Sequence, residues 1–224
     1  MRKLLTLVIF YILSLSASAT APVKSIDIYV LPYYSAQNGK AELVNVYSRI
    51  DPLLLENTVD GYQKAVKIVQ TKASYVSPMT LLALAARAYD LGFRDEAVFW
   101  FYVGQQRLLV VDHVADLSKM QMAEYVGFVQ LTKTPILAYA FCDMKKQDDI
   151  ADKAYEWTKN NPYLALLDNR IASKFKNRQE GLEDAQKMLD KREKEQKTLF
   201  NDPKTQAQIK QSRKENNVDA MYCW

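Results

Sequence analysis

The fold is decided by residues 77–104, which read SPMTLLALAARAYDLGFRDEAVFWFYVG. Ser77 precedes Pro78, and a capping residue directly before proline is typical of a helix start. Apolar side chains then recur at helical spacing as far as Gly92, which stands where a left-handed C-terminal cap belongs. The run 97–103 is apolar on every side, which indicates a buried central helix. The stretch therefore predicts two antiparallel helices, the second of them in the core.

The same start signal is repeated along the chain. A capping residue precedes proline at Asp51-Pro52, Ser77-Pro78, Thr134-Pro135, Asn161-Pro162 and Asp202-Pro203. Such pairs ahead of periodic segments predict helix starts. We expect helices over residues 58–72, 78–91, 95–111, 116–131, 135–144, 148–159, 162–176 and 181–200.

Composition supports this interpretation. Six glycines and seven prolines in 224 residues are about half the usual frequency, which argues against a turn-rich β-sandwich, a barrel or a disordered linker. A hydrophobic share of 49% is enough for a buried core. The sequence predicts an all-α fold of antiparallel helical hairpins or an irregular helical bundle.

Small and aromatic residues of the deciding stretch stand at the spacings of a helix–turn–helix repeat, namely Ala85, Gly92, Ala97, Phe101 and Gly104. In these positions residues 81–104 resemble a single tetratricopeptide repeat. The resemblance implies close helix packing and peptide or protein binding on a concave face. Tyr89 lies one place from the expected aromatic, Leu81 replaces an early tryptophan and Leu109 replaces the closing proline. No second copy is evident, so a generic helical hairpin stays open.

The first residues have the layout of a secretory signal peptide. Arg2 and Lys3 precede the apolar run 4–15, and Ser-Ala-Ser-Ala at 16–19 offers a cleavage site. An uncleaved anchor is the alternative, because 4–23 is nearly long enough to span a bilayer. We expect cleavage, a periplasmic or secreted protein, and no membrane span in the mature chain.

Three regions follow: a signal peptide at 1–19, an extended or β-hairpin lead-in at 20–50, and one helical domain at 51–224. In the lead-in, residues 25–30 alternate in hydrophobicity and residues 43–47 resemble a strand. The Asn-Gly dipeptide at 38–39 between them favours a β-hairpin. An extended segment is the alternative.

Tyrosines cluster in that lead-in, at Tyr29, Tyr33 and Tyr34. Exposed tyrosines are favoured in protein interfaces. These three are therefore candidate partner-binding residues.

The charge is nearly balanced. Loss of residues 1–19 lowers the formal charge from +4 to +2, and residues 144–224 carry 17 basic and 14 acidic side chains. A nucleic-acid surface needs a patch of one sign, so we expect no nucleic-acid partner. The helix over 181–200 pairs acids with bases at i,i+4, at Glu183–Lys187, Asp190–Lys194 and Glu193–Lys197. It is predicted to be a solvated surface helix or an arm that grips a partner.

Catalytic patterns are scarce. His113, the one histidine, has Asp112 and Asp116 nearby, yet a lone histidine near a helix end more often caps carbonyls or lies at the surface. Ser173 and Lys176 have S-x-x-K spacing without its partner motifs. The acidic pairs Asp95-Glu96 and Asp148-Asp149 fall where helices are predicted to begin, where acids complement the helix dipole. We expect no catalytic residue, metal or cofactor.

The two cysteines, Cys142 and Cys223, both lie beyond the signal peptide. In an oxidising compartment an even pair is most simply one disulfide, which would close a loop with a sequence separation of 81 residues. Two free thiols are the alternative.

Export, helical hairpins and the lack of catalytic motifs together favour a binding module. We expect a non-catalytic protein that binds another protein, as an adaptor or as an inhibitor or immunity-type protein that neutralises an envelope-targeted protein. The alternative is a carboxylate-dependent periplasmic hydrolase acting on cell wall or glycans, since such chemistry needs two carboxylates alone.

Overall fold

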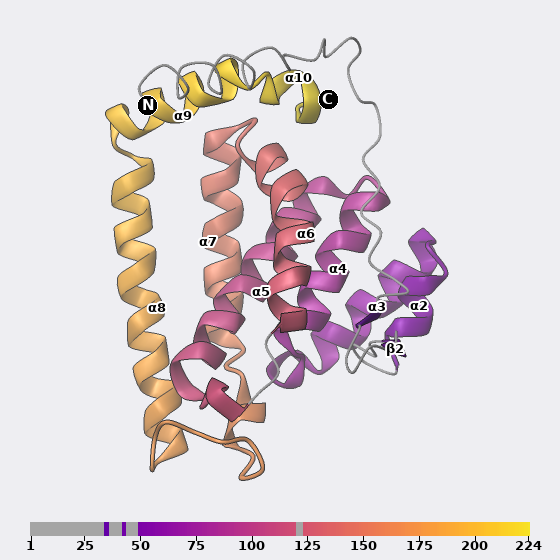
Figure 1. The fold of residues 1–224 in the computed structure, drawn as a ribbon, viewed down its shortest axis with the longest axis vertical. Helices are drawn as coiled ribbons and strands as arrows, with labels where there is room; N and C mark the ends of the chain where they lie inside the picture. The colour runs from indigo at the N-terminus through magenta and orange to yellow at the C-terminus, as the bar shows by residue number, and fades with distance from the viewer. Residues whose placement is uncertain (1–33, 36–41, 44–48, 120–122) are drawn as a thin grey trace, which may run out of the picture.

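A computed structural model describes residues 34–35, 42–43, 49–119 and 123–224 (Figure 1). Within these residues the fold is all-α, as predicted. The helices are α2 (Asp51–Leu55), α3 (Val59–Thr71), α4 (Pro78–Asp90), α5 (Arg94–Val114), α6 (Ala123–Ala140), α7 (Met144–Asn160), α8 (Arg178–Phe200), α9 (Pro203–Glu215) and α10 (Val218–Tyr222).

The α4–α5 hairpin forms the core, and its predicted signals are confirmed. The Ser77 hydroxyl accepts a hydrogen bond from the Thr80 amide at 3.2 Å, and Gly92 has a φ of +84°. The helices meet closely at Gly104, where an added Cβ would lie 3.0 Å from Leu82 Cγ. Phe101 is fully buried. The helical hairpin is therefore shown, while descent from a repeat stays a prediction.

Helix α5 is the central element, against which α4, α6, α7 and α8 all pack (Figure 1). Its first half belongs to a large apolar cluster shared with α3, α4, α6 and α7. Its last turns, with Val110 and Val114, form a second cluster with Leu182, Ala185 and Leu189 of α8. The two clusters divide the core along the length of α5.

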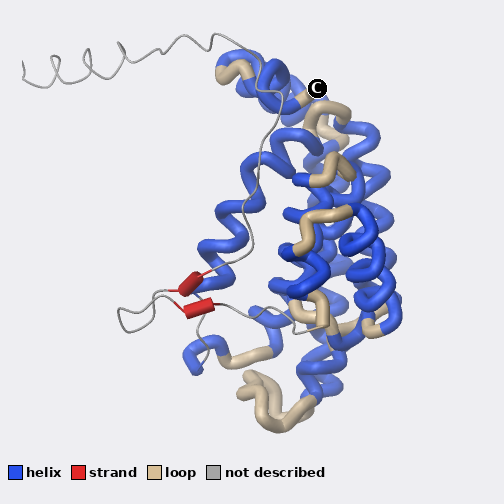
Figure 2. The backbone as a smooth tube through the Cα atoms, turned by 90° about the vertical axis from the view of Figure 1, so that its right-hand side faces the viewer, coloured by secondary structure: helices blue, strands red, loops and turns tan. Residues whose placement is uncertain are grey.

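Helices α8, α9 and α10 (178–222) form what we call the bracket. In Figure 1, α8 runs alongside α7, and α9 then turns across the end of the helical stack. The view turned by 90° places α9 and α10 at the same end (Figure 2). Asp202 caps α9 by accepting a hydrogen bond from the Thr205 amide at 2.8 Å. Neither α9 nor α10 has a buried residue.

Two helix boundaries were predicted wrongly around Pro135 and Asp143. Thr134-Pro135 does not start a helix, because α6 runs through it. Pro135 is buried and Ile136 is fully buried, so packing outweighs the hydrogen bond that proline removes. Helix α7 begins at Met144 instead of 148, since the Asp143 carboxylate accepts a hydrogen bond from the Lys146 amide at 3.0 Å.

The helix predicted over 162–176 is also wrong. A short 3-10 helix (Leu164–Leu167) is followed by a loop. The loop pairs with the end of α5: the Asp116 amide donates to the Ala172 carbonyl and the Lys174 amide to the Val114 carbonyl, both at 2.9 Å. These long-range bonds satisfy the backbone without a helix.

Within the predicted lead-in 20–50, the structure describes residues 34–35, 42–43 and 49–50. Strand β1 (Tyr34–Ser35) pairs antiparallel with β2 (Glu42–Leu43). The predicted arm 25–30 and the predicted signal peptide 1–19 lie outside the described residues, and so do all residues of the predicted arm 43–47 except Leu43. Across the ranges that are described, no helix is both long and apolar enough to cross a membrane.

Candidate functional site

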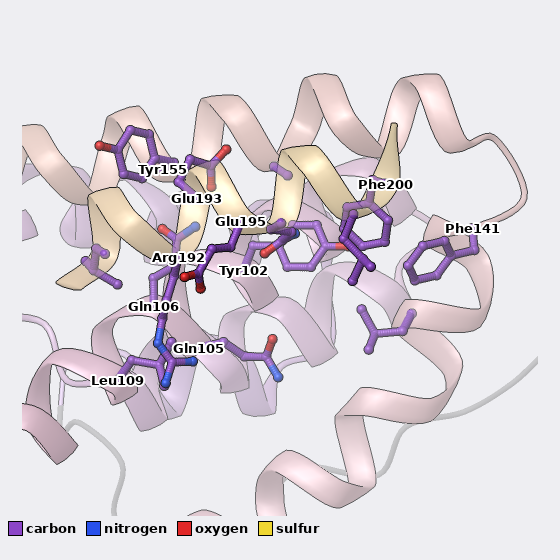
Figure 3. Close-up of a pocket in the computed structure, with 15 residues that line it drawn as sticks. Tyr102, Gln105, Gln106, Leu109, Phe141, Tyr155, Arg192, Glu193, Glu195 and Phe200 are labelled. Atoms are coloured by element: carbon purple, nitrogen blue, oxygen red, sulfur yellow. The ribbon is translucent and has the colours of Figure 1, made fainter. Parts of the chain in front are cut away.

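A groove of about 480 Å³ lies between the bracket and the helical stack (Figure 3). One wall is the upper half of α8, with Leu199 and Phe200, and the facing surface comes from α5, α6 and α7. Leu109, Leu137 and Phe141 make that facing surface apolar. The groove is therefore a long cleft between helices, a common place for ligand and partner sites.

A second hollow of about 690 Å³ lies beneath α9. Phe141 and Phe200 line both spaces, and their ring centroids are 5.6 Å apart. Lys145, Lys210 and Arg213 give the second hollow basic side chains beside several acids. We refer to these two adjoining spaces, which share Phe141 and Phe200, as the bracket groove.

The groove exists because α8 extends beyond the core on which it packs. Asn177 caps the helix by accepting from the amides of Gln179 and Glu180. In the first half of α8, Leu182 and Leu189 are buried, whereas Leu199 near its end is 56% exposed. Leu199 thus lies beyond the part of α8 that packs on the core, and this end of the helix is open toward the groove.

A tyrosine and a carboxylate are fixed at the edge of the groove. The Tyr155 hydroxyl donates to Asp190 Oδ1 at 2.7 Å, and Gln186 Nε2 donates to the same oxygen at 2.6 Å. These two hydrogen bonds lower the pKa of Asp190. Burial, followed by the hydrogen bond to Asp190, raises the pKa of Tyr155 to about 12. Asp190 is thus held ionised and Tyr155 neutral at neutral pH.

Two carboxyl groups, Glu193 of α8 and Asp152 of α7, influence each other about one turn further along α8. Burial and then the charge of Asp152 raise the pKa of Glu193, which lines the groove. Asp152 itself pairs with Lys197, 2.7 Å away. Lys197 was predicted to pair with Glu193 within α8, but it reaches α7 instead. The result is a carboxyl group, Glu193, that holds its proton more tightly than usual.

Amide side chains border the apolar surface, at Gln105, Gln106 and Gln196. The Oε1 atom of Gln106 is buried without a hydrogen-bond partner among the described residues. An amide offers both donors and an acceptor, which match the main-chain groups of a peptide. Apolar walls with amides and charges of both signs are thus suited to a polypeptide.

No group of three or more histidine, cysteine, aspartate or glutamate side chains suited to a metal ion occurs in the described part of the chain. The acidic pair at the start of α5 has structural partners. Asp95, in the first turn of α5, accepts from the Tyr139 hydroxyl at 2.8 Å, and Glu96 accepts from the Tyr62 hydroxyl at 2.6 Å. Asp148 and Asp149 lie in the second turn of α7, not at its start as predicted.

The predicted cysteine pair is confirmed. Cys142, after α6, and Cys223, after α10, form a disulfide with a Cα–Cα distance of 5.5 Å. It fastens the bracket to the helical stack beside the second hollow. Of the three candidate tyrosines, Tyr29 and Tyr33 lie outside the described residues, and the backbone of Tyr34 belongs to β1.

His113 and Ser173 take structural positions. His113 Nε2 lies 2.8 Å from Asp184 Oδ2 on α8 and not beside Asp112 or Asp116 as a catalytic pair would. Ser173 Oγ donates to the Val114 carbonyl at 3.3 Å. Neither arrangement has the nucleophile and base in contact that acyl-transfer chemistry requires.

Two arginines that sequence reasoning missed hold the site in place. Arg107 is buried in the core, and Arg94 stacks on Trp224 with its guanidinium carbon 3.8 Å from the ring centroid. Arg94 Nη1 also donates to the Trp224 carbonyl at 2.6 Å. The sequence feature that could have indicated the groove is the apolar stripe of α8, which continues to Leu199 through an otherwise charged segment.

Fold and site define an all-α protein with a disulfide-fastened groove. The chain belongs to the same family as an uncharacterized protein of Haemophilus influenzae, with which it is 44% identical over 214 residues, covering 96% of this chain and 85% of the relative. No protein-family model matches the chain, and no solved structure matches it significantly.

Proposed function

We propose that the protein is an exported, non-catalytic module that binds a polypeptide segment of another protein in the bracket groove. The observation that carries the proposal is the open apolar face of α8 opposite Leu109, Leu137 and Phe141. An adaptor and an inhibitor of an envelope-targeted protein would both use such a face. Export is supported by the signal-like residues 1–19 and by the disulfide, which favours an oxidising compartment.

Amide and charged side chains around the groove support a peptide over a small apolar ligand. The pair Arg192 and Glu195 places both signs of charge near the Gln105 and Gln106 amides. Peptide main chains need both donors and acceptors, and mixed charges select side chains. An apolar anchor residue of the partner would then pack against the apolar side chains that line the groove, such as Leu137 and Phe141.

Site-specific photo-crosslinking tests this proposal. A crosslinking amino acid at Leu199 should capture a discrete partner protein in the envelope, whereas the same group at Leu55 should not. Leu55 is a matched control, since it is 47% exposed and lies on α2, outside the groove. Equal capture at both positions, or none at Leu199, would contradict groove binding. Cell fractionation and N-terminal sequencing of the mature chain test export.

A hydrolase is the second candidate, because Glu193 lines the groove with a raised pKa next to Asp152. Acid catalysis of glycoside cleavage uses two neighbouring carboxyl groups, one of which holds its proton more tightly than usual. Purified protein incubated with peptidoglycan or glycans decides the matter. Release of product that Glu193→Gln abolishes, with unchanged folding, would replace the binding proposal with this one.

A further inference from the structure

The Cys142–Cys223 disulfide lies at the surface. Both cysteines are exposed, and Cys142 lines the hollow beneath α9. Thiol–disulfide exchange requires that an attacking thiolate reach a sulfur atom. Solvent exposure of both cysteines meets that requirement, unlike the buried disulfide of a closed core.

A fixed positive charge faces both sulfur atoms. Arg213 Nη2 lies 3.2 Å from Cys223 Sγ and 3.5 Å from Cys142 Sγ. Its side chain is 11% exposed, so water screens it little. A guanidinium at this distance stabilises the thiolate that leaves when the disulfide opens.

The two sulfurs are not equivalent. Asp219 accepts from Arg213 Nε at 2.7 Å and lies 3.6 Å from Cys223 Sγ, which disfavours a thiolate on Cys223. Cys142 lies between the end of α6, where its Sγ is 3.5 Å from the Ala138 carbonyl, and Asp143, the N-cap of α7. The full negative charge of Asp219 beside Cys223 Sγ outweighs the partial charge of that carbonyl, so Cys142 is the better leaving group and Cys223 the sulfur to be attacked.

Among the described residues, the end of the bracket is attached by few buried contacts. Helices α9 and α10 bury no residue, and the remaining attachments include the stack of Trp224 on Arg94 and the contact between Phe200 and Phe141. Elements with few buried contacts open at low free-energy cost. Breaking the disulfide would therefore free α9 and α10 while the α4–α5 core stays folded.

We propose that Cys142–Cys223 is a thiol–disulfide exchange site for a dithiol reductant, and that its reduction releases α9 and α10 from the end of the bracket groove. One thiolate of the reductant attacks Cys223 Sγ, forming a mixed disulfide and expelling the Cys142 thiolate, which takes up a proton. The second thiol of the reductant then attacks the mixed disulfide, and the Cys223 thiol leaves. The protein gains two thiols, and the reductant becomes a disulfide.

Reduction kinetics of the native mature chain test the chemical step. Dithiothreitol should open the disulfide in native buffer, as measured by alkylation and mass spectrometry. Arg213→Gln should slow the reaction about threefold, because the leaving thiolate loses its counter-charge. Lys204→Gln, which removes an α9 cation outside the lining of the hollow, should leave the rate unchanged. A disulfide that resists dithiothreitol until the protein unfolds, or equal rates in all three proteins, would overturn the proposal.

Hydrogen exchange tests the release. After reduction, amides of α9 and α10 should exchange at least tenfold faster while those of α4 and α5 keep their protection. Cys142→Ser/Cys223→Ser should show the fast exchange without reductant, which separates release from any effect of the reagent. Unchanged protection of the α9 and α10 amides in the reduced protein would contradict the proposed release. Neither measurement needs a groove partner, so both stand apart from the proposed binding function.

Discussion

The α4–α5 hairpin and the bracket are stabilised in different ways. Every α4 residue from Pro78 to Tyr89 is buried, and Phe101 of α5 has no exposed surface. The bracket has buried residues in the first half of α8, then a disulfide and an arginine–tryptophan stack at its far end. Dense apolar packing thus fixes one region, and a few specific links position the other, which is the region that forms the groove.

The largest expected effect lies in the hairpin. Phe101→Ala removes a fully buried aromatic and should lower the free energy of unfolding by about 3–5 kcal/mol, through lost transfer free energy and the cavity left behind. Leu199→Ala in the bracket should change it by less than about 0.5 kcal/mol, because the side chain is 56% exposed. Urea unfolding followed by circular dichroism measures both.

Similar losses of unfolding free energy in Phe101→Ala and Leu199→Ala would contradict the difference between the hairpin and the bracket. A large loss in Leu199→Ala would mean that the upper half of α8 is packed in solution and that the groove is closed. Phe99→Ala is a useful intermediate, since this side chain on α5 is partly buried against the core. Its loss should fall between the other two.

Sequence reasoning succeeded where local signals coincide with dense burial. Ser77 and Gly92 mark the ends of α4 by caps that depend on a few neighbouring residues. The same kind of signal failed at Thr134-Pro135, because packing around Ile136 extends α6 through the proline. It failed again over 162–176, where the backbone pairs with residues some sixty positions away. The pattern of neighbouring residues in the sequence does not indicate hydrogen-bond partners that lie so far along the chain.

The second expected effect concerns Arg107, which ties the hairpin to its surroundings. Nη1 donates to the carbonyls of Ala73 and Val76 at 2.7 and 2.8 Å, and Nη2 donates to that of Asn161 at 2.6 Å. Burial lowers the pKa of the guanidinium to about 10, so it is charged at neutral pH. Arg107→Ala should cost about 2–4 kcal/mol, because buried carbonyls lose their donors.

Chemical denaturation measures the free energy of unfolding of Arg107→Ala, and Arg178→Ala is the comparison variant. Arg178 also donates to carbonyls, those of Leu166, Asn169 and Ile171, but at the partly exposed base of α8. Its loss should therefore be smaller. Equal losses would show that burial of Arg107 adds nothing to its hydrogen bonds. Sequence reasoning missed this role, because an arginine whose partners are backbone carbonyls looks in the sequence like any other charged residue.

The third effect is local to the bracket. Arg94→Ala removes the cation–π stack on Trp224 and the hydrogen bond to its carbonyl, and should weaken the attachment of α10 by about 1 kcal/mol. Limited proteolysis near α10 should become about fivefold faster, with the global unfolding midpoint almost unchanged. Arg170→Ala is the control, because its pair with Asp168 is largely solvent-exposed. Faster proteolysis in both variants would rule out a specific tether.

The smallest effect depends on pH. Tyr155 and Gln186 lower the pKa of Asp190 in the folded protein, so its ionised form stabilises the fold above the unfolded pKa of about 3.8 and loses this contribution as the pH falls through the folded pKa. Asp190→Asn should cost about 0.5 kcal/mol at pH 6, and the difference from the parent protein should shrink below pH 4. Asp149→Asn, at an exposed α7 position, is the control variant. The same pH dependence of stability in both variants would mean that the contact between α7 and α8 depends on apolar burial rather than on the Asp190 carboxylate. The bracket would then be stabilised by apolar packing, as the hairpin is.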